Sequence, residues 1–312
     1  MQLYKSRDFS AFFQDTFSFL KQNGKHFFKQ FFIINGIFLL ILMVLGYFFT
    51  KFYTDVVFGG LLQNNPNAMD DYFNDNFGMF LLFIFVFLTV GLASGIISYA
   101  YTAIYLKLYV ENDGNSFNSK TIIDSYKAKI GKLFIFLICS ILIGIPLVMV
   151  AGIIMFILTI TIIGILLLPV LIGAIALFYY MTLMEYMENK KGIWESFGYA
   201  WTLLSSKFWT AVGSVGLFYL MAYILQNVIT IIPYIFGMAS VFTTIDEGAP
   251  NPEDLGTTMM IIMLAVFFIS FIIGTILNTI IQLNQGIVFY SLKEEKESIN
   301  TRSIIDQIGS GE

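Results

Sequence analysis

Residues 133–184 read LFIFLICSILIGIPLVMVAGIIMFILTITIIGILLLPVLIGAIALFYYMTLM and contain no charged side chain. A helix that crosses the hydrocarbon core of a bilayer, about 30 Å thick, needs about 20 apolar residues. The stretch is therefore too long for one crossing and has the right length for two. Thr159, Thr161 and Gly164, near its middle, predict a tight turn between the two spans.

Further uncharged stretches on both sides predict four more spans, which makes six in all. Pro146 and Pro169 fall inside spans, where proline kinks a helix rather than breaking it. The fifth span is predicted to end near Pro233 to Gly237. We expect an all-α polytopic membrane protein, with residues 1–312 forming a single integral membrane domain. The four further stretches are Phe31–Thr50, Gly78–Leu106, Phe208–Ile245 and Leu255–Leu292.

The composition excludes several classes of protein. Hydrophobic residues make up 57% of the chain and charged residues 12%, whereas soluble domains carry about 25% charged residues. A soluble enzyme, a nucleic-acid-binding protein and a disordered protein are therefore excluded. One Cys excludes a disulfide framework and a multi-cysteine metal site, and one His excludes a site that needs several imidazoles.

The distribution of basic residues predicts the orientation in the membrane. Every Lys and Arg except Lys51 lies before the first span, between spans two and three or four and five, or after span six. Since basic residues stay on the cytoplasmic side, both termini are predicted to be cytoplasmic. The first 30 residues are too polar for a cleavable signal, so span one is expected to be an uncleaved anchor. The opposite side carries the acidic residues Asp55, Asp70, Asp71, Asp75, Asp246, Glu247, Glu253 and Asp254.

A short pattern recurs before spans one, three and five and after span six. Each copy has an apolar residue, a variable residue, an acid, a small polar residue or Gln, and then an aromatic residue or Ile. We interpret three copies of one unit, residues 8–110, 117–190 and 191–292, each with an amphipathic interfacial helix followed by two spans, and a cytoplasmic tail over 293–312. The repeated acids are Asp15, Asp124, Glu195 and Asp306.

Two interpretations of the repeated acid stay open. Thr121-x-x-Asp124 and Ser303-x-x-Asp306 fit a capping box at a helix start, and this structural interpretation is favoured. The alternative is a shared cytoplasmic docking or regulatory motif. In the third copy, aromatic and apolar residues recur at steps of three and four and are expected on one helix face at the headgroup level. These residues are Trp194, Phe197, Trp201, Leu204 and Phe208.

Three pairs of spans, each introduced by an amphipathic segment, resemble a large group of bacterial six-helix inner-membrane proteins. The group includes the membrane domain of some glycerophosphoryl diester phosphodiesterases and several families of unknown function. The resemblance lies in Glu195-Ser196-Phe197, Trp201 and Phe208-Trp209, and in Phe17-Ser18-Phe19-Leu20-Lys21. It implies an integral protein of the bacterial cytoplasmic membrane. The phosphodiesterase activity of that group resides in a separate soluble barrel, for which this chain has no room.

Polar residues recur on single faces of spans two, five and six. Because polar side chains facing lipid are unfavourable, we expect these faces to point inward. The favoured interpretation is helix packing, with Gly91 and Gly95 as a GxxxG pair, and the alternative is a polar cavity for a small ligand or a lipid headgroup. The candidate residues are Ser98, Thr102, Gln226, Asn227, Thr230, Thr275, Asn278, Thr279 and Gln282.

Titratable chemistry within the spans is sparse. No Asp, Glu, His, Lys or Arg lies at midplane, which disfavours a proton-driven transporter. Lys107, Glu185 and Glu188 lie at span ends, where long side chains are expected to reach water. His26 is expected to be an ordinary interfacial residue and Cys139 an inert packing residue. We therefore expect no catalytic residues, no metal and no cofactor.

The sequence favours a non-enzymatic inner-membrane protein that acts as a scaffold, assembly partner or regulator. Its expected partners are the lipid bilayer and membrane proteins that contact its cytoplasmic interfacial helices, and not nucleic acid. The alternative is a transporter or channel for a small molecule or lipid, which would use the polar faces of spans two, five and six.

Overall fold

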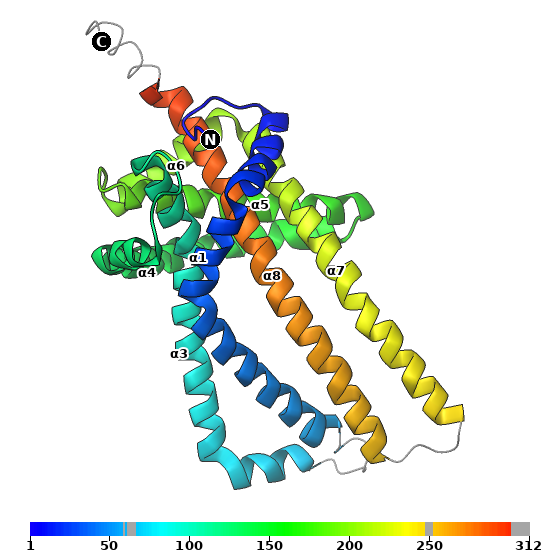
Figure 1. Cartoon of the computed structure of the whole chain (residues 1–312). Coiled ribbons are helices and arrows are strands. Elements are labelled where there is room, and N and C mark those ends of the chain that lie inside the picture. Colours follow the sequence, from blue (N-terminus) through cyan, green and yellow to red (C-terminus); the bar gives the residue numbers. More distant parts are fainter. Residues whose placement is uncertain (59, 61–66, 247–251, 301–312) are drawn as a thin grey trace, which may run out of the picture. The chain divides into compact units, whose positions relative to one another are not determined.

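The computed structural model describes residues 1–58, 60, 67–246 and 252–300, and it contains only helices and their connections there. The elements, in the colours of Figure 1 from blue to red, are α1 (Phe9–Phe52), the π-helix η1 (Tyr53–Phe58), α3 (Ala68–Glu111), α4 (Ser119–Thr159), α5 (Ile162–Met187), α6 (Ile193–Ser206), α7 (Phe208–Asp246) and α8 (Pro252–Glu297).

Six of these helices are long and apolar enough to cross a membrane: α1, α3, α4, α5, α7 and α8. The helix α6, with 14 residues, is too short to cross, since each residue adds about 1.5 Å. The prediction of an all-α polytopic protein with six membrane-spanning helices is therefore confirmed.

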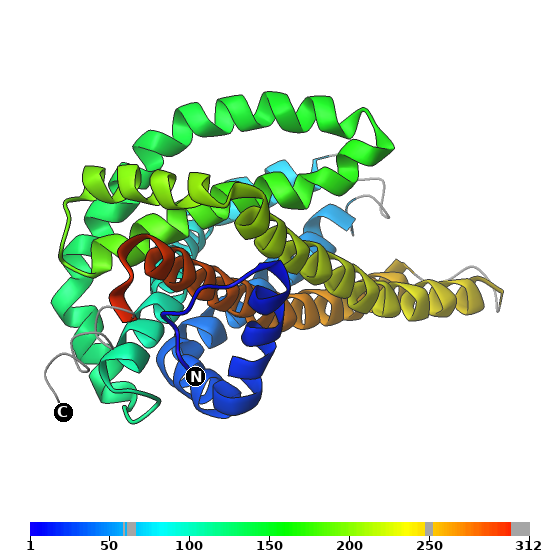
Figure 2. The same ribbon diagram turned by 90° about the horizontal axis from the view of Figure 1, so that it is seen from above.

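The uncharged stretch of residues 133–184 forms the predicted pair of helices. α4 and α5 are joined by a tight turn, visible in Figure 2 as the green hairpin. Thr161 caps α5, because its Oγ1 accepts a hydrogen bond from the Gly164 N–H at 2.9 Å. A Cβ at Gly164 would lie 2.0 Å from the Leu158 carbonyl oxygen. Only glycine fits there, so the predicted turn is confirmed.

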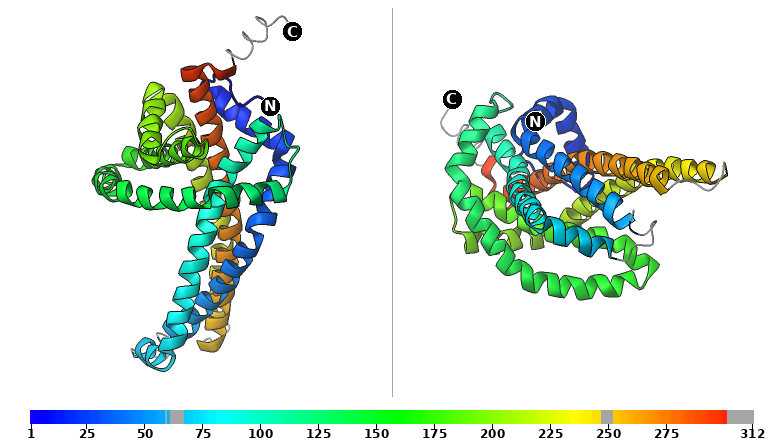
Figure 3. Two further views of the ribbon diagram at one scale, coloured as in Figure 1. Left: turned by 90° about the vertical axis from the view of Figure 1, so that its left-hand side faces the viewer. Right: turned by 90° about the horizontal axis from the view of Figure 1, so that it is seen from below.

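Three predicted element boundaries are wrong. The interfacial segments before spans one and three are not separate helices, because α1 and α4 each run without interruption into the span. A continuous helix keeps the backbone groups bonded where the chain enters lipid. Only α6 is separate, and it packs along α5 (Figure 3). α7 also continues past Pro233 to Asp246, since proline removes one backbone donor without forcing a membrane helix to end.

The described chain falls into two compact units. The first unit comprises Met1–Ile34, Ser98–Met221 and Asn278–Glu312, and the second comprises Asn35–Ile97 and Ala222–Leu277. The first unit thus holds α4, α5 and α6 entirely, together with parts of α1, α3, α7 and α8. The division differs from the three predicted repeat units, and the repeat stays a prediction.

Aromatic side chains of α1 and α3 form the core of the first unit. The rings of Phe27 and Tyr105 meet edge to face with centroids 4.9 Å apart, and those of Phe31 and Tyr101 do so at 5.1 Å. All four side chains are fully buried. Each such pair contributes about 0.5–1.5 kcal/mol beyond the burial of its area.

A close approach of α5 and α7 also stabilises the first unit. A Cβ at Gly173 would lie 3.0 Å from the Gly216 nitrogen, and one at Gly216 would lie 3.0 Å from the Val170 Cα. Glycine at both positions lets the two backbones approach. The predicted GxxxG pair behaves differently, because a Cβ at Gly91 or Gly95 would meet nothing within 4 Å.

Candidate functional site

A buried ion-pair cluster lies in the first unit, where α5 ends and α8 passes. Lys293 and Glu185 have fully buried side chains, and Glu188 is nearly buried. The Lys293 Nζ lies 2.6 Å from Glu185 Oε2 and 2.6 Å from Glu188 Oε2. The Lys191 ammonium contacts the other oxygen of Glu185. Two carboxylates therefore bind two ammonium groups at close range, and a third ammonium group, that of the exposed Lys190, lies 3.8 Å from Glu188 Oε2.

Side chains from two further elements cover this cluster. From α6, Tyr199 donates a hydrogen bond to Glu297, and its ring lies 3.8 Å from the Lys191 Nζ, a cation–π distance. From the N-terminal segment, the Tyr4 hydroxyl donates to Glu188 Oε1 at 3.4 Å. The ion-pair cluster and these tyrosines therefore join the N-terminal segment and α8 to the consecutive helices α5 and α6.

The hydroxyl groups of Tyr4 and Tyr199 remain protonated. Burial raises the pKa of Tyr4 well above its usual range, and the nearby Glu188 and Glu297 raise it further. Burial likewise raises the pKa of Tyr199, with the hydrogen bond to Glu297 adding to the effect. Both hydroxyls are thus hydrogen-bond donors to carboxylates at physiological pH.

The expectation that Glu185 and Glu188 reach water from their span end is wrong for Glu185. Glu185 stays buried because Lys293 supplies a countercharge at hydrogen-bond distance. Lys107 also has a partner in the protein, because its ammonium donates a hydrogen bond to the Met187 carbonyl at 3.2 Å. The cluster was not predicted, although the Glu185-x-x-Glu188 spacing and Lys293 at a span end place opposite charges at one depth.

Asp15, the first of the repeated acids, does not cap a helix. The cap of α1 is Asp8, whose carboxylate accepts a hydrogen bond from the Ala11 N–H at 2.8 Å. Instead, Asp15 pairs with the buried Arg7 at 2.8 Å. Burial lowers the pKa of Arg7, and Asp15 opposes that shift. The Arg7 guanidinium also donates to the carbonyls of Gln2, Leu3 and Lys5, which fixes the N-terminal segment.

The capping interpretation holds for Glu195 and fails for Asp124, as it does for Asp15. Glu195 accepts from the Gly192 N–H at 3.1 Å at the start of α6, so capping is confirmed there. The box Thr121-x-x-Asp124 is wrong, because Asn118 is the cap of α4 and accepts from the Thr121 N–H at 3.2 Å. Asp124 lies one turn further on, exposed. Ser303 and Asp306 lie outside the described residues.

Polar residues of the first unit bond across helices. Thr102 of α3 donates to Gln282 of α8 at 3.4 Å, and both are buried. The Asn284 amide of α8 donates to Thr16 of α1 at 3.0 Å and to Ser214 of α7 at 3.3 Å. Thr279 is buried, Ser98 is half-buried and Asn278 is exposed. The contacts of Thr102 and Gln282 are the ones expected of packing faces, whereas the expectation that these residues point inward is wrong for Asn278.

Polar residues of the second unit bond chiefly along their own helices. Asn227 donates to the Tyr223 carbonyl at 2.7 Å, Thr230 to the Asn227 carbonyl at 3.2 Å, and Thr275 to the Phe271 carbonyl at 2.7 Å. Gln226 faces α8, where its amide would lie 3.3 Å from a Cβ at Gly274. Asn227 is exposed, so the expectation that these faces point inward is wrong for it as well. The nine candidate residues are divided between the two units.

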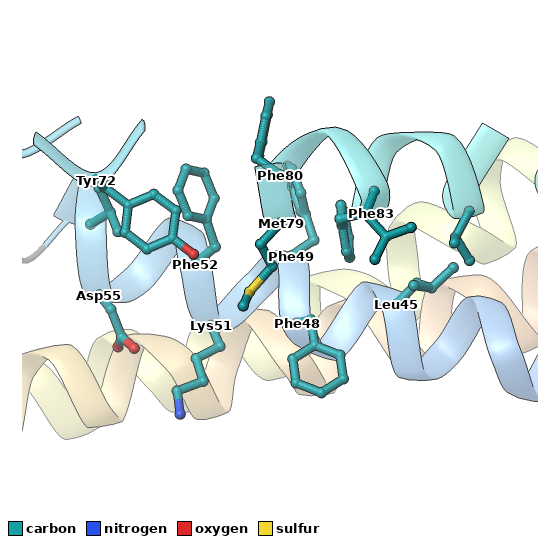
Figure 4. A pocket seen from close by; sticks show the side chains of 13 residues that line it. Leu45, Phe48, Phe49, Lys51, Phe52, Asp55, Tyr72, Met79, Phe80 and Phe83 are labelled. Atoms are coloured by element: carbon teal, nitrogen blue, oxygen red, sulfur yellow. The ribbon is translucent and has the colours of Figure 1, made fainter. Parts of the chain in front are cut away.

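The second unit has an apolar pocket of about 610 Å³ between α1, η1 and α3 (Figure 4). Asp55 and Tyr72 lie at one end of it and Leu45 and Phe83 at the other. α3 bends at Asn76, whose φ of −123° and ψ of 17° are not helical. The pocket was not predicted, because its lining is apolar and does not differ in sequence from an ordinary span. Its lining is Leu45, Phe48, Phe49, Lys51, Phe52, Asp55, Val56, Tyr72, Met79, Phe80, Leu82, Phe83 and Val86.

His26 belongs to the first unit and bridges two elements. Its Nδ1 lies 2.8 Å from the Tyr105 hydroxyl and its Nε2 lies 2.9 Å from the Phe117 carbonyl oxygen. Since a carbonyl only accepts, Nε2 carries a hydrogen. The ring ties α1 to the connection before α4.

Comparison of the chain with protein-family models, curated proteins and solved structures found no match.

Proposed function

We propose that this chain is a non-enzymatic membrane scaffold, an assembly or regulatory protein that acts by binding other membrane proteins. The observation that carries the proposal is the ion-pair cluster. Glu185 and Glu188 are each held by an ammonium group, so neither carboxylate is free for proton transfer. The cluster stabilises a fixed arrangement of four segments, which suits a binding platform.

The exposed side of α6 supports a binding role. Phe197 and Leu204 pack into the core, whereas Trp194 and Trp201 are 59% and 61% exposed. The predicted single apolar face is therefore divided: its smaller residues face the core and its tryptophans face outward. Exposed tryptophans on a membrane-bound helix suit either headgroups or a neighbouring protein.

Two exposed carboxylates allow a sharp test of docking. Asp124 pairs only loosely with Lys127, at 3.8 Å with both side chains largely exposed. Gln at position 195 keeps an oxygen for the cap. The variant Asp124→Asn/Glu195→Gln should therefore fold normally. We expect it to lose proteins that co-purify stoichiometrically with the wild type in mild detergent, as measured by quantitative mass spectrometry.

The matched control is Lys127→Gln, which changes an exposed charge on the same face of α4. An unchanged partner set in Asp124→Asn/Glu195→Gln would reject docking through these acids. Absence of any stoichiometric protein partner from the wild type would reject the scaffold itself.

We propose further that the protein lies in the bacterial cytoplasmic membrane with both termini in the cytoplasm. The bias of Lys and Arg supports this orientation. Cys139 is the single cysteine, so Cys139→Ala provides a background for labelling. Lys127→Cys should react with a membrane-impermeant thiol reagent only after the cells are permeabilised. Asp71→Cys should react with it in intact cells. The reverse pattern would reject the orientation.

The pocket of the second unit favours a second candidate function, the handling of lipid. Its volume lies within the range of about 300–1,000 Å³ typical of ligand sites, and its lining is almost entirely apolar. Val86→Trp should fill the pocket and reduce lipid transfer between vesicles. Phe85→Trp is the control, because Phe85 is exposed and does not line the pocket. Equal transfer by both variants and the wild type would exclude this role.

A further inference from the structure

Three lysines of the first unit converge where α5 ends. Lys107 on α3 donates to the Met187 carbonyl at 3.2 Å. Lys132 on α4 donates to the Tyr186 carbonyl at 2.9 Å, with its Nζ 4.3 Å from the Tyr186 ring centroid. Carbonyls in the last turn of a helix lack partners within the helix and carry its negative dipole. These contacts therefore fix two ammonium groups beside the end of α5.

The third lysine, Lys129, lies one turn before Lys132 on α4 and is only 9% exposed. The pKa of Lys129 is lowered to about 7, first by burial and then by the Lys107 side chain and the charge of Lys132, while Glu111 opposes the shift. Glu111 already pairs with Lys107 at 3.6 Å and is half exposed. Among the described residues, no hydrogen bond or salt bridge joins the Lys129 ammonium to an acceptor.

This arrangement contrasts with the ion-pair cluster in the same unit. There, each ammonium group lies beside a buried or nearly buried carboxylate. Here, three lysine side chains meet one carboxylate that faces water, so a proton on each of the three leaves positive charge unpaired in a largely buried place. A buried, unpaired charge is unfavourable unless an opposite charge accompanies it. An anion bound here would pair with that charge and keep Lys129 protonated.

We propose that Lys107, Lys129 and Lys132 form a binding site for a phosphate group. Phosphate oxygens accept charge-assisted hydrogen bonds from several ammonium groups at once. Lys132 directly precedes the uncharged stretch that starts at Leu133, and Lys107 directly follows the one that ends at Leu106. The site therefore lies at the depth of phospholipid headgroups. A phospholipid and a soluble phosphate share the chemistry that the site recognises.

The lipid arm of the test uses nanodiscs of phosphatidylcholine with and without phosphatidylglycerol. Lys129→Met keeps the apolar stem and removes the ammonium. The control, Lys127→Met, removes a charge from the same helix at a side chain that is 75% exposed. Wild type and Lys127→Met should retain phosphatidylglycerol, measured by mass spectrometry of the purified protein. Lys129→Met should bind it about tenfold more weakly, and Lys129→Arg should restore binding.

The soluble arm uses inorganic phosphate in detergent free of phospholipid, against chloride at equal ionic strength. A higher unfolding midpoint with phosphate in wild type and Lys127→Met, but not in Lys129→Met, would support a soluble phosphate as the source. Retention of phosphatidylglycerol alone would support a lipid headgroup. The proposal is overturned if neither probe binds the wild type, or if Lys129→Met matches Lys127→Met in both arms.

A measurement on the wild type keeps the test decisive if Lys129→Met does not fold. Acetylation of individual lysines can be followed by mass spectrometry with and without the two probes. An occupied site should slow acetylation of Lys129 and leave that of Lys127 unchanged. Equal rates at Lys129 with and without both probes would overturn the proposal.

Discussion

At the scale of single residues, Lys293 is a fully buried cation shared by two carboxylates. Removing one partner of a buried ion pair typically destabilises a protein by about 3–5 kcal/mol, because the other charge stays buried and unpaired. We predict such a loss for Lys293→Met. The double variant Lys293→Met/Glu185→Gln should recover part of it, which can be measured as a double-mutant cycle by unfolding in detergent.

A control for this prediction is the exposed pair of Lys127 and Asp124. Exposed pairs contribute about 0–1 kcal/mol, so Asp124→Asn should change the unfolding free energy by less than about 1 kcal/mol. If Lys293→Met were as mild as Asp124→Asn, the buried pair would not be a stabilising element of the first unit.

The raised pKa values of Tyr4 and Tyr199 predict a loss of stability at alkaline pH. In the unfolded chain, tyrosine releases its proton near pH 10, whereas the folded protein keeps both phenols protonated beyond that pH. Above about pH 10 the unfolded state therefore binds fewer protons, and the unfolding free energy falls as pH rises. Below about pH 10 both states keep these protons, so Tyr4 and Tyr199 contribute fully to the unfolding free energy there.

The measurement is the unfolding midpoint from pH 8 to pH 11 in wild type and in Tyr4→Phe/Tyr199→Phe. Lysines also lose protons in this range, so the informative quantity is the difference between the two slopes. The variant should lose stability less steeply. Identical slopes would contradict the link to these phenols.

Residue roles were predictable from the sequence only where the partner is near in the chain. Glu195 bonds to a backbone group three residues away, so a local motif was enough to identify the cap. Lys293 and Glu185 are 108 positions apart, and only the packing of α5 against α8 brings them together. The lysine site has the same cause, because its residues come from α3 and α4 and meet at the end of α5.

At the scale of helices, the crossing of α5 and α7 depends on Gly173 and Gly216. The atoms that face a new Cβ there are mainly backbone atoms, which cannot move aside. We predict that Gly173→Ala or Gly216→Ala destabilises the protein by about 1–3 kcal/mol, as overpacking does. Gly131→Ala on α4, where nothing lies within 4 Å, should instead stabilise it by up to about 1 kcal/mol.

The tryptophans of α6 allow a prediction about depth in the membrane. Trp194 and Trp201 are largely exposed and belong to an amphipathic helix that is too short to span. Since such rings prefer the headgroup level, brominated lipids should quench tryptophan fluorescence most when the bromine lies near the headgroup. Strongest quenching by bromine at the chain ends would place α6 in the hydrocarbon core instead.

Helix existence was predictable and helix boundaries were less so. Long uncharged stretches identify spans because the bilayer fixes their length, and Gly164 marked the turn between α4 and α5. The ends of α1, α4 and α7 were missed for a common reason. A helix can continue through an amphipathic segment or past Pro233 when no neighbouring residue stops it, and apolar content alone does not reveal this.

At the scale of the whole molecule, six apolar helices predict an integral membrane protein. The chain should stay in the membrane fraction after an alkaline carbonate wash and be released only by detergent. Their exposed side chains include many large apolar residues, which would aggregate in water. Release of the folded chain by carbonate, or its solubility without detergent, would contradict the fold class.

The placement of tryptophan has a practical consequence. The protein has three tryptophans, and Trp194, Trp201 and Trp209 all belong to the first unit. Their emission is thus a built-in reporter for that unit, while the second unit is silent to it. Circular dichroism, by contrast, sees helices of both. If the melting curves from fluorescence and circular dichroism coincide, the two units unfold together. If the curves are separated, each unit unfolds independently.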